Sequence, residues 1–420
     1  MKALHKLNTQ FNRNIFYNSV GSFMYCFFQY IITIVLLRVK GAEDAGIYGL
    51  AYSYTNMFVV ISNFGMDSYQ LSDVRGRHSD GTYIAARFST SLVSVLCFSI
   101  VLFFFTDFSL KVRLCCAALM LYRILEGISG VYICILQKMD DYKTIGLSRC
   151  IKSIFVFGIF CVALYFSELN WAVICMSAAF LVVAILIDFP QVIKRAAFTA
   201  KAVKHDIINI LKPSFILVLQ GFIGNFAMFF PRYIIEKTYS IEELGYFSSI
   251  TLIMLIFPIL VSPVLSVFIP GISGLYIDKQ YYVIKRMIFR MGLCVIAGTI
   301  LLCLSSLVWG RFALSIVFGE KILPYSYLLI PVLLTSGFIL GCGVLLSVLI
   351  AMQKRVECLI VTIVAVLVVA LSCPAMIRVF YMNGSLYSLI IAYAVEGLVM
   401  LAYIFYHLRN KAAVTDNGEG

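Results

Sequence analysis

Twelve apolar stretches, separated by short polar gaps, divide this chain of 420 residues. A helix that crosses the hydrocarbon core of a bilayer needs roughly 20 mostly apolar residues. The pattern predicts spans at 14–37, 45–66, 83–106, 112–136, 146–166, 170–188, 213–235, 245–268, 287–308, 325–350, 356–377 and 385–407. With 62% hydrophobic and 13% charged residues, the composition excludes a soluble globular domain of this size. We therefore expect an all-α integral membrane protein with twelve transmembrane helices.

The basic residues fall mainly in every second gap. Of the 33 Lys and Arg residues, 23 lie at the two termini and at 67–87, 137–152, 189–212, 269–290 and 351–358. Nine are assigned to the other gaps, and Arg123, inside the fourth span, is assigned to none. Because basic loops stay on the cytoplasmic side, we expect both termini in the cytoplasm. The net charge of +12 then indicates contact with anionic lipid headgroups rather than with nucleic acid, since no soluble basic domain is present.

Two kinds of chemistry have no support in the sequence. The 13 cysteines are scattered, mostly within spans, and none forms a CxxC pair, so we expect neither a disulfide framework nor a metal site. No GxxxxGK[ST] motif for ATP binding occurs, and no cofactor is expected.

The first six spans resemble the last six. Glu43–Tyr48, at the start of the second span, resembles Glu242–Phe247 at the start of the eighth, with Gly46 and Gly245 in matching places. Six spans per half give both halves the same orientation, related by an axis along the membrane normal. The expected organisation is a cytoplasmic segment at 1–13, a six-helix half at 14–188, a cytoplasmic linker at 189–212, a second half at 213–408, and a polar, disordered cytoplasmic tail at 409–420.

Three spans carry polar residues along one face. The first has Asn18 and Gln29 among a stripe that recurs every three or four residues, the second has Tyr48, Tyr52 and Asn56, and the seventh has Asn225. Hydrogen bonding between packed helices is one explanation. A water-filled cavity between the two halves is the other, and the stripes in the first span of each half favour it.

Charged residues inside spans are the strongest site candidates, because one such charge at mid-bilayer costs roughly 2.5–3.5 kcal/mol on insertion scales. Arg123 and Glu126 share one face of the fourth span, either as part of a binding site or as a structural ion pair. Arg232 and Glu236 are expected to form a shallower couple in the seventh span. Glu396 stands alone in the twelfth span and is a candidate site for a coupling ion.

The region from Asn14 to Tyr52 resembles the Wzx-type polysaccharide flippases of the multidrug/oligosaccharidyl-lipid/polysaccharide (MOP) superfamily. A first span that begins rich in asparagine leads to Leu36-Leu37-Arg38-x-x-Gly41 and then to the acidic-x-Gly-x-Tyr run that ends at Tyr48. Gln137-Lys138 after the fourth span and the layout of two six-helix halves also fit. The resemblance implies a fold like that of the MATE and other MOP transporters.

The resemblance also implies a function and a place in the cell. The substrate would be an undecaprenyl-diphosphate-linked oligosaccharide repeat unit for O-antigen or another surface polysaccharide, moved across the bacterial inner membrane by alternating access. Membrane lipids, a polysaccharide polymerase and a chain-length regulator would be partners, with H⁺ or Na⁺ as a coupling ion. The ten candidate cavity residues would contact the substrate, and none would be catalytic.

Two other functions stay open at this point. One is a multidrug or cation exporter of the same superfamily, although the first span has no Asp or Glu. The other is an enzyme, either a polysaccharide polymerase or a lipid-dependent glycosyltransferase. The short outer gaps disfavour an enzyme, since the longest is at roughly 309–324.

Overall fold

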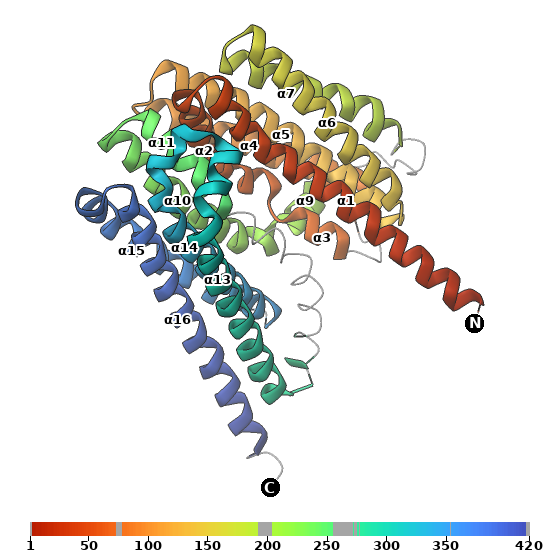
Figure 1. The fold of residues 1–420 in the computed structure, drawn as a ribbon. Coiled ribbons are helices and arrows are strands. Elements are labelled where there is room, and N and C mark those ends of the chain that lie inside the picture. Colours follow the sequence, from red (N-terminus) through yellow and green to blue (C-terminus); the bar gives the residue numbers. More distant parts are fainter. Residues whose placement is uncertain are drawn as a thin grey trace. The chain divides into compact units, whose positions relative to one another are not determined.

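The chain folds into helices throughout the part that the structure describes. This computed structural model describes residues 2–72, 78–191, 204–254, 272, 275–276, 278–352 and 354–416. The helices group into two compact units (Figure 1). Residues Met1–Lys40 and Ile47–Val218 form the first unit, and Gly41–Gly46 with Leu219–Gly420 form the second.

The first unit is a bundle of long helices joined by short connections. Its elements are α1 (Lys2–Val39), α2 (Ala42–Asn63), α3 (Met66–Ser72), α4 (Asp80–Phe104), α5 (Leu110–Lys138), α6 (Tyr142–Phe166), α7 (Leu169–Val183), a π-helical turn (Ala184–Asp188), α9 (Lys204–Leu211) and a 3-10 turn (Lys212–Ser214). The bundle packs α6 against both α1 and α7, and α5 against α7.

The second unit also consists of long helices packed side by side. Its elements are α10 (Phe215–Thr238), α11 (Ile241–Thr251), α13 (Tyr281–Phe318), a 3-10 segment (Glu320–Leu328), α14 (Leu329–Ala351), α15 (Arg355–Phe380) and α16 (Met382–Asp416). Helices α15 and α16 lie side by side along their length (Figure 1). Helices α13 and α16 both pack against α14.

Local sequence signals fix several helix starts. Ser79, Ser109, Asp141 and Ser240 precede α4, α5, α6 and α11, and each side chain accepts a hydrogen bond from the backbone N–H three residues later. These bonds satisfy backbone donors that have no partner within the helix. Gly319, at φ 90°, ends α13 in a conformation that disfavours residues with a side chain.

Ten described helices are long and apolar enough to cross a membrane, against the twelve predicted spans. The second predicted span does form a helix, α2, but its polar positions lower its hydropathy. The eighth begins as α11, and residues 255–268 of it lie outside the described residues. The prediction of a multi-pass, all-helical membrane protein is confirmed.

The C-terminal end differs from prediction. The expected disordered tail is wrong for most of its length, because α16 continues to Asp416 through a stretch that contains no Gly or Pro to break the helix. The compact units meet along the sequence at Val218 and Leu219, inside α10, and residues 192–203 of the predicted linker at 189–212 lie outside the described residues. The linker stays a prediction. The division into two six-helix halves remains a prediction.

Gly46 and Gly245 suggested the internal repeat. Each of them lies against the helix of the other, within the second unit. A Cβ atom on Gly46 would lie 2.0 Å from the carbonyl oxygen of Ile241, and a Cβ on Gly245 would lie 1.8 Å from that of Ala42. Each glycine therefore faces the carbonyl four residues before the other glycine. This reciprocal arrangement lets the first turns of α2 and α11 touch backbone to backbone.

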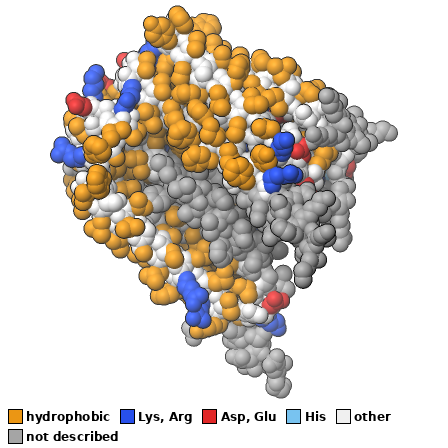
Figure 2. Space-filling view, turned by 45° about the vertical axis from the view of Figure 1, so that its right-hand side comes forward, with side chains coloured by type: hydrophobic (Ala, Val, Ile, Leu, Met, Phe, Trp, Pro, Cys, Tyr) orange, Lys and Arg blue, Asp and Glu red, His pale blue; other side chains and the backbone are white. Residues whose placement is uncertain are grey.

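The described surface suits a lipid environment. Figure 2 shows hydrophobic side chains over most of the described surface in that view, with Lys, Arg, Asp and Glu in a few small groups. Helix α13 is the extreme case, because none of the residues in its most apolar 18-residue window is buried within the chain. A helix this apolar and this uncovered requires a bilayer around it.

Candidate functional site

A polar pocket of about 360 Å³ lies inside the first unit. Five helices supply most of its wall: α1, α2, α5, α6 and α7. Its lining residues are Ser22, Tyr25, Cys26, Val59, Asn63, Asp67, Arg123, Glu126, Gly127, Ser129, Gly130, Ile133, Arg149, Lys152 and Phe180. Charged side chains in the interior of a membrane protein are costly, which makes this pocket the candidate functional site.

Two glycines bring α1 and α6 together at this pocket. A Cβ on Gly21 would lie 2.8 Å from the Cα of Gly146, and a Cβ on Gly146 would lie 2.4 Å from the carbonyl oxygen of Tyr17. Small residues allow membrane helices to approach this closely. The close crossing places Arg149 of α6 opposite the polar stripe of α1.

Arg149 makes its hydrogen bonds to neutral oxygens. Its Nη1 donates to Oδ1 of Asn18 at 3.0 Å and to Oγ of Ser22 at 2.6 Å. Within the described part of the chain it forms no ion pair. The guanidinium group therefore brings a positive charge to the pocket that no adjoining carboxylate neutralises.

Arg123 and Glu126 form the ion pair that the sequence suggested. Arg123 Nη1 lies 2.6 Å from Glu126 Oε2, and Arg123 itself is buried. The other oxygen of Glu126 accepts hydrogen bonds from the Tyr25 hydroxyl at 2.6 Å and from Gln29 Nε2 at 3.3 Å. The hydroxyl groups of Tyr25 and Tyr122 are also hydrogen-bonded, at 3.2 Å. This network links α1 to α5.

Helix α2 holds the other side of Arg123. Arg123 Nη2 donates to Oδ1 of Asn56 at 3.0 Å, and the guanidinium carbon lies 4.4 Å from the centre of the Tyr52 ring. The ring of the buried Tyr48 lies 6.1 Å from that of Tyr52. Arg123 is therefore held by a carboxylate, an amide and an aromatic face together.

Lys152 and Asp188 form a second ion pair, and it is buried on all sides. Both side chains are at most 2% exposed. The Lys152 ammonium also donates to Ser129 Oγ at 2.6 Å and lies 4.9 Å from the Phe180 ring centre. Asp188 accepts from Ser129 at 2.7 Å and from Ser148 at 2.5 Å. The π-helical turn that ends at Asp188 sets the position of this carboxylate, and such turns often occur at functional sites.

A third ion pair, Arg87 with Asp67, lies at the edge of the pocket. The Arg87 side chain is 1% exposed and also donates to Asn63 Oδ1 at 2.9 Å, whereas the Asp67 side chain is 47% exposed. The pairs Arg87–Asp67, Arg123–Glu126 and Lys152–Asp188 are each balanced. Arg149 therefore leaves the cluster with one excess positive charge.

Seven of the predicted site residues converge in this unit. They are Asn18, Gln29, Tyr48, Tyr52, Asn56, Arg123 and Glu126, and all but Tyr48 contact the charged network directly. The stripes on the first two spans therefore face a common polar interior. Hydrogen bonding between packed helices is present, and the polar faces of α1 and α2 also border the pocket within the first unit. The predicted water-filled cavity between the two halves stays a prediction.

The predicted residues of the seventh span are arranged differently. Asn225 donates to the carbonyl of Gly221 at 2.8 Å, within its own helix. Among the described side chains, the expected Arg232–Glu236 couple does not form. Arg232 donates to the carbonyl of Met228 at 2.8 Å and to the Thr251 hydroxyl at 3.2 Å, and Oε2 of Glu236 has no hydrogen-bond partner. The expectation failed because four residues on a helix place two side chains on one face without requiring contact.

Glu396 lies in the interior of the second unit and is 6% exposed. Nearby, the Thr362 hydroxyl donates to the carbonyl of Cys358 at 3.0 Å and accepts a hydrogen bond from Gln220 at 3.2 Å. The role of Glu396 as an ion-coupling residue stays a proposal.

Sequence reasoning missed Arg87, Arg149, Lys152 and Asp188. It assigned the three basic residues to cytoplasmic gaps and Asp188 to a span end, whereas all four lie inside the helical bundle. One signal was available, because Arg149 and Lys152 follow Gly146 inside a helix that has no other charged residue from there to Phe166. Among the described residues no group of three or more His, Cys, Asp and Glu side chains is arranged to hold a metal ion.

Comparison with known proteins agrees with this architecture. The profile of the family described as "Polysaccharide biosynthesis protein" matches residues 11–276. The chain belongs to this family. It is also similar to the capsular polysaccharide biosynthesis protein CapF of Staphylococcus aureus, with 24% identity over 347 residues, 79% of this chain and 85% of CapF.

Solved structures identify the fold. A point mutant of the MATE transporter VcmN of Vibrio cholerae aligns over 98% of this chain and 99% of its own, with a TM-score of 0.63 and 12% identity. An inward-facing multidrug-resistance MATE transporter of the MOP superfamily aligns over 94% and 96%, with a TM-score of 0.68 and 14% identity. A MOP transporter of Pyrococcus furiosus gives a TM-score of 0.63 at 14% identity, over 94% and 95% of the two chains. The chain thus has the fold of the MOP transporters, as the sequence resemblance implied.

Proposed function

We propose that this protein is a flippase that moves undecaprenyl-diphosphate-linked oligosaccharide repeat units across the cytoplasmic membrane for synthesis of a surface polysaccharide. The observation that carries the proposal is the excess positive charge of Arg149 in the pocket of the first unit, where its hydrogen-bond partners are the neutral Asn18 and Ser22. A cation held in this way suits an anionic group such as a diphosphate or an acidic sugar.

The pocket chemistry also suits a sugar head group. Each hydroxyl of a glycan costs several kcal/mol to strip of water unless a polar partner replaces that water, so spontaneous flipping is very slow. Tyr25, Asn63 and Ser22 offer such partners along the pocket wall. A volume of about 360 Å³ is at the small end of ligand sites, so the pocket would take one acidic part of the head group, such as an acidic sugar, rather than a whole repeat unit.

Drug and cation export, the nearest alternative, fits the pocket less well. The acidic residues Asp67, Glu126 and Asp188 are each already paired with a basic side chain. A cationic substrate would have to displace one of these basic groups, whereas an anion would approach Arg149 without displacing a carboxylate.

The transport cycle would be alternating access, in which parts of the protein rock around the bound substrate. Because the chain has no ATP-binding motif, an ion gradient, a substrate gradient or removal of the product would drive it. Glu396 is the candidate for coupling to H⁺ or Na⁺. Both termini would lie in the cytoplasm, and a polysaccharide polymerase and a chain-length regulator would act on the exported repeat units.

Deletion of the gene in its native host tests the proposal. The deletion strain should lose the surface polysaccharide and accumulate lipid-linked repeat units whose sugars face the cytoplasm, as measured by their protection from externally added glycosidase in intact spheroplasts. Wild-type protein should restore export. If the surface polysaccharide persists in a strain without any related transporter, or if the deletion changes only drug resistance, the assignment is wrong.

A further inference from the structure

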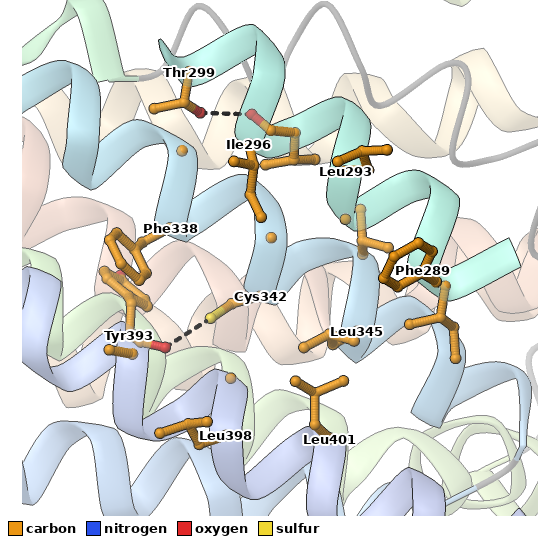
Figure 3. A pocket seen from close by; sticks show the side chains of 18 of the residues that line it. Phe289, Leu293, Ile296, Thr299, Phe338, Cys342, Leu345, Tyr393, Leu398 and Leu401 are labelled. Carbon is orange, nitrogen blue, oxygen red and sulfur yellow. Dashed lines mark hydrogen bonds between the residues drawn. The ribbon is translucent and has the colours of Figure 1, made fainter. Parts of the chain in front are cut away.

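The second unit carries a long apolar groove on its membrane-exposed side. The groove has a volume of about 770 Å³ and lies between α13, α14 and α16 (Figure 3). Phe289, Leu293 and Ile296 of α13 form one wall, and Leu398 and Leu401 of α16 lie across from them (Figure 3). Cys342 of α14 lies between the two walls. Several of these side chains are more than half exposed within the chain, so a bilayer component would contact them.

Glycines shape the groove. A Cβ atom on Gly292 or Gly341, both in the lining, would have no atom within 4 Å. Farther along α13 the helices close up, because a Cβ on Gly337 would lie 2.3 Å from Oγ1 of Thr299. The groove is therefore open to the outside along its length and narrows near Thr299.

Length argues for a particular lipid. Along α13 the lining runs from Lys285 to Ile300, which corresponds to about 22 Å of helix. The hydrocarbon core of a bilayer is about 30 Å thick, so the acyl chains of one leaflet reach only about 15 Å. A groove that continues past the bilayer midplane fits a chain longer than a phospholipid acyl chain.

Charge is placed at one end of the groove. Lys285 is the charged residue among the described lining side chains, and its ammonium lies 5.9 Å from the ring centre of Phe405. It lies about 36 Å along α13 from Trp309, an exposed indole of the kind found at membrane interfaces. Lys285 therefore lies at the headgroup level of the opposite leaflet, where lipid phosphates lie.

We propose that this groove holds the polyprenyl chain of the carrier lipid, with its diphosphate at Lys285. The proposal rests on the proposed function, because it assigns the tail of the same substrate to a second site. The chain would stay in contact with the membrane while the glycan enters a polar pocket. Such a site would let the protein recognise the carrier lipid independently of the attached sugars.

Photolabelling tests the groove directly. The probe is undecaprenyl diphosphate without sugars, carrying a diazirine in mid-chain, bound to the purified protein in nanodiscs. We expect labelled peptides from α13 and α14 at the groove. Gly341→Leu and Gly292→Leu should lower the labelling at least about tenfold, equivalent to about 1.4 kcal/mol. Gly343→Leu and Gly298→Leu are matched controls, since these glycines also have free space but do not line the groove.

The charge is tested separately. Lys285→Gln should weaken labelling by the diphosphate probe about fivefold and leave labelling by an uncharged polyprenol probe unchanged, since only the diphosphate interacts with the ammonium. Arg286 is exposed on the same helical turn, and Arg286→Gln should leave labelling by the diphosphate probe and by the polyprenol probe unchanged. Equal labelling by a photoreactive phosphatidylglycerol that undecaprenyl diphosphate fails to displace would overturn the proposal, as would undiminished labelling of Gly341→Leu. Because this binding assay involves no glycan and no transport, a wrong flippase assignment and a wrong groove assignment give different results.

Discussion

Lys152 of α6 and Asp188 at the end of the π-helical turn form an ion pair that is almost completely buried within the first unit. Ser129 and Ser148 complete the hydrogen bonds of the pair from α5 and α6. Burying two charges is costly, and the pair is stable only because each charge has the other and additional hydrogen bonds. The two residues therefore depend strongly on each other.

Removing one member of this pair should destabilise the protein. Lys152→Met leaves the Asp188 carboxylate buried without a cation, at a cost of about 3–5 kcal/mol. The double variant Lys152→Met with Asp188→Asn should recover most of this loss, because a neutral amide can still bond to both serines. Thermal unfolding of the purified protein measures both effects. Lys143→Met, an exposed lysine on the same helix, should shift stability by less than about 0.5 kcal/mol. Additive losses in the double variant would contradict the coupling.

Arg149 is the residue on which substrate binding should depend most. Arg149→Gln keeps a polar side chain at this position but removes the excess charge beside Asn18 and Ser22, so we expect surface polysaccharide export to fall at least about tenfold. Arg149→Lys should retain part of the activity, since it keeps the charge but loses the planar geometry. Arg113→Gln in the same unit, whose guanidinium donates to the carbonyl of Thr106, serves as the control and should export normally. Normal export by Arg149→Gln would remove the main support for an anionic substrate at this pocket.

Arg123 should be needed for export because it joins α2 to α5. Arg123→Ala removes the contacts to Glu126, Asn56 and Tyr52 together, and we expect it to abolish export. Arg123→Lys preserves the charge and should partly spare it. Measuring the amount of folded protein in the membrane separates loss of activity from loss of structure. If Arg123→Ala is present at the wild-type level and exports normally, Arg123 has no role in transport.

The glycine contact in the second unit should tolerate no side chain. Gly46→Ala or Gly245→Ala would place a methyl group about 2 Å from a backbone oxygen, so the helices must separate. Overpacking of this kind costs typically 1–3 kcal/mol and sometimes more. Gly343→Ala, in open space within α14, should instead be neutral or stabilising by roughly 0.5–1 kcal/mol. Unfolding temperatures measure both changes in stability. A decrease for Gly46→Ala or Gly245→Ala, together with no change or an increase for Gly343→Ala, distinguishes the backbone contact from a general effect of adding a methyl group.

Hydrophobic periodicity predicted the helical, membrane-spanning character of the chain because apolar length is a local property. Ten of the predicted spans correspond to long apolar helices. The polar stripes on α1 and α2 border one pocket within the first unit, since side chains three or four residues apart share a helix face. The cavity between the two halves that the stripes favoured stays a prediction. The helix ends were harder to predict. Helix α16 continues into the expected tail because nothing in the sequence there stops a helix.

The charge cluster could be predicted only in part, and the reason is the rule used for topology. Counting basic residues by gap treats each of them as a loop residue, which hid Arg87, Arg149 and Lys152 in the cytoplasmic total. Their true partners are Asp67, Asn18 and Asp188, from 20 to 131 positions away along the chain. Only tertiary structure brings such residues together. The Arg123–Glu126 pair was found because both members lie within one helical turn.

The reciprocal contact of Gly46 and Gly245 also limits how this protein can evolve. The atoms that block a side chain at Gly46 are the carbonyl of Ile241 and the backbone nitrogen of Gly245, which every amino acid shares. Changing a neighbouring side chain therefore creates no room, and a damaging substitution at one glycine has no suppressor at the other. A genetic selection that starts from Gly46→Ala should return mainly true reversions to glycine. The two positions are each fixed by the backbone of the other helix, so they cannot coevolve as a pair.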